Sequence, residues 1–244
     1  MSLISYAQYS QIVNLDKVKY RMMVKIAELF VEQGAIIFGG FVRDKYIHDC
    51  YARIFYKNEN TNEDGYGDES YDPETKHRLL VPKDIDVFVR GNEDDVRKIY
   101  SFITEKGFSV RIKRSKVFYG LFKDIHQQKV SIKTMSEIGL PTIQIELDVI
   151  YSSDDVKPPF NRLDLWCNSL LMDKNGITVS NQTGSKVDNW EPFGRKILEG
   201  EILRDLLKFE TKKTEFNSKG LNEQIIIDRI ESMKKRGWII KEEL

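Results

Sequence analysis

The ten residues Ala35-Ile36-Ile37-Phe38-Gly39-Gly40-Phe41-Val42-Arg43-Asp44 decide how this chain is expected to fold. The apolar run 35–38 predicts a short buried strand, the two glycines predict a turn, and a helix is expected to begin near Phe41. Glycine lets backbone N–H groups approach a phosphate closely, and a helix N-terminus favours an anion. We therefore expect Gly39 and Gly40 to cradle a phosphate, and Arg43 to reach that phosphate or to brace nearby acids. A Gly-Gly pair on its own is more often an ordinary turn.

Two later stretches place acids on strands that the sequence predicts to be buried. Asp84 and Asp86 come just before one apolar run, and Glu146 and Asp148 come just before another. Carboxylates are rare in buried strands unless they are paired or bind a metal. Residues two apart in a strand point to the same face, so Asp84 and Asp86 are expected to lie side by side.

These acids predict a metal site. Like charges this close repel one another unless a cation lies between them. A third carboxylate from a neighbouring strand would complete a site for two Mg²⁺ ions about 4 Å apart, and hard oxygen ligands suit Mg²⁺ or Mn²⁺. We predict Asp84, Asp86 and Asp148 as the catalytic, metal-binding residues, and Glu146 stays open as an alternative to Asp148. An Asp-x-Asp outside a strand is more often a loop or capping feature.

The composition predicts an intracellular, soluble protein. The chain has 244 residues, of which 41% are hydrophobic, enough for a sizeable core. Lys+Arg and Asp+Glu both number 38, so net charge indicates no nucleic-acid partner and only local patches could. Two cysteines, Cys50 and Cys167, argue against a disulfide framework or a zinc site. No signal peptide and no apolar stretch of about 20 residues is present, so we expect no membrane partner and a cytoplasmic location.

Hydrophobic periodicity and turn residues predict a mixed α+β chain. Helices are expected at about 15–33, from 41 to 48, from the Asn92 cap to Gly107, and at about 162–172, 198–209 and 221–236. Strands are expected at 35–38, 79–89, 108–112, 117–122, 130–133 and 142–151, with a hairpin around 173–176.

The predicted organisation has a large first domain and a small helical end. Residues 58–78 are rich in acids, Asn, Gly and Ser, which predicts a mobile insertion. We expect a domain at 1–195 that contains this insertion, followed by a C-terminal helical segment at 196–244.

Three motifs together resemble the nucleotidyltransferase superfamily of the DNA polymerase beta type, and most closely the head domain of class II tRNA CCA-adding enzymes and bacterial poly(A) polymerases. Residues 39–44 resemble the Gly-Gly-x-Val-Arg-Asp of that family, and residues 84–86 resemble its Asp-x-Asp. Residues 162–170 resemble its Arg-Arg-Asp-Phe-Thr-x-Asn-Ala-Leu segment.

The resemblance implies a nucleotidyltransferase fold, in which a mixed β-sheet is flanked by helices, and it implies binding of a nucleoside triphosphate such as ATP. The nucleotide-binding residues that it implies are Gly39, Gly40, Arg43, Asp44, Arg162, Asp164 and Asn168. Leu163 and Trp166 depart from the motif, and residues 201–205 are only a faint echo of the base-reading Glu-Asp-x-x-Arg. The long helical body that grips tRNA does not fit in the remaining residues, so a true CCA-adding enzyme is not expected.

A cluster of cations between the second and third acidic motifs suggests an RNA partner. Arg111, Lys113, Arg114 and Lys116 could form one basic face that follows a phosphate backbone. An ordinary solvated sheet face explains the same residues, and the sequence leaves both interpretations open.

The function expected from these features is Mg²⁺-dependent transfer of a nucleoside monophosphate from a triphosphate to a hydroxyl, most directly an RNA 3′ end. Two alternatives stay open. One is nucleotidyl transfer to a small molecule or a protein, and the other is a non-catalytic nucleotide-binding protein on the same fold.

Overall fold

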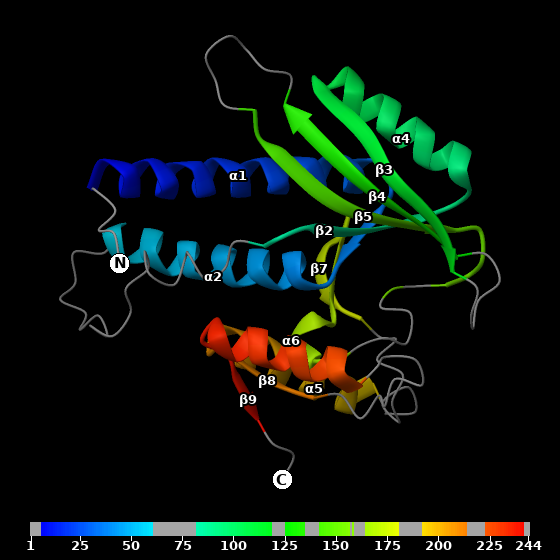
Figure 1. The fold of residues 1–244 in the computed structure, drawn as a ribbon. Coiled ribbons are helices and arrows are strands. Elements are labelled where there is room, and N and C mark those ends of the chain that lie inside the picture. Colours follow the sequence, from blue (N-terminus) through cyan, green and yellow to red (C-terminus); the bar gives the residue numbers. More distant parts are fainter. Residues whose placement is uncertain are drawn as a thin grey trace. The chain divides into compact units, whose positions relative to one another are not determined.

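The computed structural model describes residues 6–60, 82–118, 125–134, 142–156, 158, 164–180, 192–213 and 223–241. Helices flank a seven-stranded mixed sheet, which confirms the expected α+β class (Figure 1). The strand order is β3-β4-β5-β2-β1-β6-β7, and a separate two-stranded sheet has the order β8-β9.

The chain divides into two compact units, each built from separated stretches. Unit 1 comprises Met1–Ile37, Val81–Val156 and Asp173–Asn175. Unit 2 comprises Phe38–Leu80, Lys157–Met172 and Gly176–Leu244. The division between residues 195 and 196 that the sequence suggests stays a prediction.

Unit 1 is built on the long strands of the sheet. Its strands are β1 (Ile36–Phe38), β2 (Ile85–Arg90), β3 (Phe108–Phe118), β4 (Ile125–Thr134) and β5 (Gln144–Ser152). β3 pairs antiparallel with β4, β4 pairs antiparallel with β5, and β5 pairs parallel with β2. The sequence predicts two strands at 108–112 and 117–122, but the structure has one continuous strand, β3, that absorbs an irregularity as a bulge.

Two helices, α1 (Tyr6–Glu32) and α4 (Glu93–Glu105), pack on this part of the sheet. α1 buries Met23, Ile26 and Phe30, which recur at helical spacing. α4 begins at the predicted cap: the Asn92 side chain accepts hydrogen bonds from the backbone of Asp94 and Asp95, and Asp95 completes a capping box.

Tyr100 fixes which sheet face α4 covers. This α4 residue donates a 2.9 Å hydrogen bond from its hydroxyl to Gln128 Oε1 on β4. Gln128, Val130 and Ile132 share one face of β4, and all are buried. Lys129 and Ser131, which alternate with them, therefore lie on the opposite face.

Unit 2 contains α2 (Gly40–Asn60), the 3-10 turn η1 (Trp166–Asn168), β6 (Leu170–Asp173), β7 (Gly176–Val179) and α5 (Pro192–Leu207). It ends with β8 (Glu210–Lys212), α6 (Glu223–Lys235) and β9 (Ile239–Lys241). β8 and β9 pair in parallel, and the sequence analysis missed both because each is only three residues long. The hairpin predicted around 173–176 is confirmed by the turn between β6 and β7.

The helix predicted at 162–172 is wrong over its described part. Only Trp166–Asn168 is helical, and β6 follows from Leu170. Asp164 Oδ1 accepts hydrogen bonds from the Leu165 backbone N–H at 2.9 Å and from the Asn168 side chain at 3.1 Å. Such local side-chain bonds compete with a helix for backbone groups.

The helix that follows the glycines is longer than predicted. α2 extends past His48 to Asn60 and so includes the first residues of the predicted insertion. The rest of that insertion, from residue 61, lies outside the described residues. In the part of the chain that the structure describes, no helix is both long enough and apolar enough to cross a membrane.

The strand–glycine–helix turn predicts different costs for its two glycines. Gly39 has a φ of 75°, which an L side chain adopts only with strain, whereas a Cβ at Gly40 would meet Arg43 Nη2 at an ordinary 3.5 Å. We expect Gly39→Ala to lower the free energy of unfolding by about 1–2 kcal/mol, and the matched control Gly40→Ala to change it by less than about 0.5 kcal/mol. Urea denaturation measures both, and equal effects would contradict the assigned turn.

Candidate functional site: a carboxylate face and an arginine network

The parallel pairing of β2 with β5 brings two of the three predicted metal ligands together. Asp86 lies directly opposite Asp148 in the register of the two strands. Their neighbours Ile85, Val87 and Leu147 alternate with them and are buried. The two carboxylates therefore share one face of the sheet. Lys129 of β4 lies opposite Asp148 of β5 and so occupies the same face. We call this side of the unit 1 sheet the charged face.

Asp84 interacts electrostatically with Asp148. Asp84 lies just before β2 and is largely exposed to solvent. Partial burial of its carboxylate and then the negative charge of Asp148 raise the pKa of Asp84, although Lys129 and Lys83 oppose the shift. The negative charge that acts on Asp84 is thus that of Asp148, and the repulsion expected between Asp84 and Asp86 stays a prediction.

Lysines lie at different distances from Asp148, the predicted third ligand, and from Glu146, its alternative. Lys113 Nζ lies 2.6 Å from Glu146 Oε1, whereas Lys129 Nζ lies 3.4 Å from Asp148 Oδ1. Partial burial raises the pKa of Glu146, but hydrogen bonds from Lys113 and Gln144 outweigh it and lower the pKa overall. Glu146 is thus already engaged, which favours Asp148 as the residue that acts beside Asp86.

The acids fit a divalent cation by their chemistry. Carboxylate oxygens are the ligands that Mg²⁺ and Mn²⁺ prefer, and the strain of like charges between Asp84 and Asp148 would be relieved by a bound cation. Within the described ranges, however, no group of three or more His, Cys, Asp or Glu side chains is gathered closely enough to hold a metal ion as it stands. Binding at Asp84, Asp86 and Asp148 therefore requires their side chains to converge.

A bulge in β3 collects basic residues on the same charged face. Arg111 lies opposite Ser131, and after a register shift between Ile112 and Arg114, Arg114 lies opposite Lys129. Side chains alternate along a strand, so Arg111 and Arg114 would point to opposite faces without the extra residue. The shift puts both on the face of Ser131 and Lys129.

Lys113 and Lys116, the other two predicted basic residues, lie on the same charged face. Lys116 lies opposite Gln127, which shares a face with Lys129, and Lys113 reaches Glu146 on that face. The four residues predicted as a basic face therefore share one side of the sheet, and all are exposed: Arg111, Lys113, Arg114 and Lys116.

Unit 2 holds the predicted nucleotide-binding residues that the structure describes, and hydrogen bonds join four of their side chains: Arg43, Asp44, Asp164 and Asn168. Arg43 donates from Nε to Asp44 Oδ1 at 2.7 Å and from Nη1 to Asn168 Oδ1 at 3.0 Å. Its guanidinium lies over the Trp238 ring at 5.0 Å and contacts Met233 Sδ at 3.5 Å. Arg43 is only 3% exposed, so it braces Asp44 and Asn168 and does not project towards solvent.

Asp44 compensates the buried charge of Arg43. Burial alone would lower the pKa of Arg43, but the charge of Asp44 and its hydrogen bond raise the pKa overall. A buried arginine that loses its carboxylate partner would be an uncompensated charge, which is strongly destabilising. This pair therefore stabilises the start of α2 as well as forming part of the motif.

The two motif aspartates in unit 2 are buried and paired with arginines of α6 and of the turn that follows it. Asp164 Oδ2 lies 2.8 Å from Arg229 Nη1, and Asp44 Oδ2 lies 3.3 Å from Arg236 Nη2. The sequence analysis missed both arginines because only the three-dimensional fold brings α6 to these acids. Arg162 lies outside the described residues.

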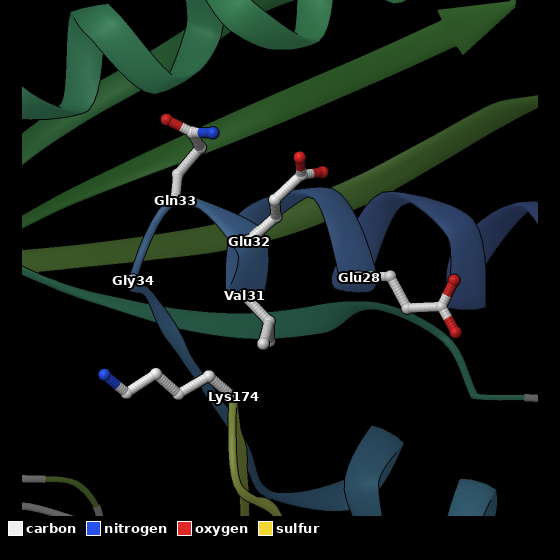
Figure 2. Close-up of a pocket in the computed structure, with 6 residues that line it drawn as sticks. All are labelled: Glu28, Val31, Glu32, Gln33, Gly34 and Lys174. Carbon is white, nitrogen blue, oxygen red and sulfur yellow. The ribbon is translucent and has the colours of Figure 1, made fainter.

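Two surface hollows, one in each unit, are lined by residues other than the predicted site residues. Figure 2 shows an open one in unit 1 at the end of α1, lined by Glu28, Val31, Glu32, Gln33, Gly34 and Lys174. It contains no predicted site residue. A hollow of about 40 Å³ in unit 2 adjoins Trp166 and Cys167. Small-molecule sites typically occupy several hundred Å³, so this hollow does not accommodate a nucleobase as it stands.

Substituting lysines tests which acid is the third ligand. Lys129→Met removes the positive charge beside Asp148, so we expect Mn²⁺ to bind about two- to fivefold more tightly. The matched control Lys113→Met frees Glu146 and should leave the Mn²⁺ affinity unchanged. Electron paramagnetic resonance of free Mn²⁺ measures both affinities. The reverse pattern would assign the role to Glu146.

The strained Asp84 predicts a pH-dependent gain in stability on substitution. Because the folded-state pKa of Asp84 is raised above its ordinary value of 3.8, its ionisation destabilises the fold as the pH rises above that value. We expect Asp84→Asn to raise the melting temperature at pH 7, and the gain to vanish below about pH 3, where the carboxyl is protonated in both states.

Asp95 provides a control of opposite sign. Hydrogen bonds from Lys98 and from the Asn92 backbone lower the pKa of Asp95. Its ionised form therefore stabilises the fold, and Asp95→Asn should lower the melting temperature at pH 7. A loss of stability in both variants would contradict the raised pKa assigned to Asp84.

Comparison of the chain with known proteins found no relative: no protein-family model, curated protein or solved structure matches it. The resemblance to nucleotidyltransferases therefore depends on the three motifs alone, and the function that it implies is a proposal.

Proposed function

We propose that the protein transfers a nucleoside monophosphate from a nucleoside triphosphate to a hydroxyl group, with an RNA 3′ end as the acceptor. The observation that carries this proposal is the register of β2 and β5, which pairs Asp86 with Asp148. Partial burial and the charge of Asp148 also raise the pKa of Asp84. Repelling carboxylates on one sheet face have no structural benefit, so a cation-dependent function accounts for their presence better than packing does.

In this reaction the acceptor hydroxyl oxygen forms a bond to the α-phosphorus while the bond to pyrophosphate breaks. Asp84 and Asp86 would hold Mg²⁺ or Mn²⁺, which supplies positive charge to the triphosphate when bound. Asp148 extends from the neighbouring strand and would align the acceptor hydroxyl. Gly39 and Gly40 would bind the phosphates of the nucleotide through backbone N–H groups, and the buried Arg43 would act by bracing Asp44 and Asn168.

The basic residues of the charged face favour a nucleic-acid acceptor. Arg111, Arg114 and Lys116 share the face of the acid pair and are exposed. Arginine and lysine side chains along one strand can follow successive phosphates of a single strand of RNA. Free thiols at Cys50 and Cys167 are consistent with an intracellular setting, where such substrates are made.

One observation favours a second candidate, a non-catalytic nucleotide-binding protein. Lys129 and Lys113 already balance Asp148 and Glu146 without any added cation. A face neutralised in this way could persist after catalysis is lost. Transfer to a small molecule or a protein hydroxyl is the third outcome that an experiment must separate.

The test is incubation of the protein with each of the four labelled triphosphates, Mg²⁺ or Mn²⁺, and pooled RNA. We expect label on RNA, and we expect Asp84→Ala combined with Asp86→Ala to lower it by more than about a hundredfold because the cation ligands are lost. Glu105→Ala combined with Asp155→Ala, which removes two exposed acids elsewhere in unit 1, is the matched control.

The alternatives give different results. Label on protein or on a small molecule would move the proposal to another acceptor. Nucleotide binding without any transfer would favour the non-catalytic candidate. Transfer that survives in the folded double-aspartate variant would overturn the metal assignment.

A further inference from the structure

We propose that Arg229 on α6 binds a phosphate group of the nucleotide, and that the buried Asp164 acts only by holding Arg229 in place. The inference deepens the proposed function, since it takes the nucleoside triphosphate as the ligand. It assigns the contact to a residue that lies outside all three sequence motifs.

Asp164 is too enclosed to contact a ligand itself. Its side chain is 3% exposed. Oδ1 accepts hydrogen bonds from the Leu165 backbone and the Asn168 side chain, and Oδ2 lies 2.8 Å from Arg229 Nη1. The position of this carboxylate is thus fixed by its own loop and by α6.

Arg229 is half in solvent, unlike its partner. Its side chain is 52% exposed, although Nη1 is held by a buried carboxylate. A guanidinium is planar and carries donors on more than one edge, so the edge turned away from Asp164 can still present N–H groups. Arginine in this geometry matches a phosphate by two parallel hydrogen bonds.

The anchoring distinguishes Arg229 from an ordinary surface arginine. A flexible surface arginine loses side-chain entropy when it binds an anion. The buried Asp164 already restricts Arg229, so less of that entropy remains to be lost on binding. Pre-organisation of this kind increases affinity without adding a contact.

α6 is itself firmly seated on the motif residues of unit 2. Met233 in the last turns of α6 contacts the guanidinium of Arg43, and Arg236, in the turn directly after α6, lies 3.3 Å from the buried Asp44. α6 and the turn that follows it therefore contact both motif aspartates, and these contacts hold the helix that carries Arg229.

The experiment measures binding of inorganic tripolyphosphate and of ATP to the full chain by calorimetry, without divalent metal. We expect Arg229→Gln to weaken both by about tenfold, and Arg229→Lys to weaken them less, because lysine keeps the charge but not the paired donors. Arg97→Gln is the matched control: Arg97 is also an exposed arginine with a carboxylate at 2.8 Å, on α4 of unit 1. It should bind as the wild type does.

Asp164→Asn separates positioning from structure. If Asp164 acts through Arg229, Asp164→Asn should weaken binding, and combining it with Arg229→Gln should add nothing further. The double variant also removes the unpaired buried charge that Arg229→Gln leaves behind, so its melting temperature should recover while its binding stays weak. Binding that recovers together with stability would show that Arg229 is only a structural clamp and would overturn the inference.

The two proposals can fail separately. If wild type transfers nucleotide but Arg229→Gln binds tripolyphosphate and ATP unchanged, the inference is wrong and the proposed function stands. If binding depends on Arg229 but no transfer occurs, the phosphate site stands without the transferase. If the wild type binds neither compound, the inference is overturned.

Discussion

The parallel pairing of β2 with β5 is the constraint on which the candidate site depends. It sets Asp86 opposite Asp148, and the alternation of side chains along both strands then sends their apolar neighbours to the opposite face. A shift of one residue in this pairing would bury the acids and expose Ile85 and Leu147. The burial of these apolar side chains therefore holds the two carboxylates on one face, and packing on one face of the sheet determines which charges lie on the other.

The same sheet shows how one extra residue changes a surface. The bulge between Ile112 and Arg114 reverses the alternation of β3 partway along, so cations from both halves of the strand reach one side. β3 is at the edge of the sheet, where a bulge disturbs pairing on one side only. The result is a face with acids on β2 and β5 and bases on β4 and β3, a charge gradient that runs across the strands.

Features of the fold that depend on neighbours in the sequence could be predicted, whereas features that depend on pairing between distant residues could not. The turn at Gly39 and the helix cap at Asn92 depend on neighbours within a few residues, so the sequence alone indicates them. The register of β2 and β5 joins residues about sixty positions apart, and no local pattern specifies it. The bulge in β3 also escapes prediction, because its position depends on the pairing with β4. Arg229 escapes for a similar reason: nothing near it in sequence indicates that Asp164 is its partner.

The buried Arg43–Asp44 pair has a consequence for how such chains evolve. Loss of either residue removes the partner of a buried charge, so selection for folding alone would retain both. Asp84 is under the opposite pressure, since burial and the charge of Asp148 disfavour its ionised form. In a chain selected for folding alone, Asp84 would therefore be replaced sooner than Arg43 or Asp44. The motif most easily noticed is thus retained by packing, and the carboxylate that strains the fold is the better indicator of function.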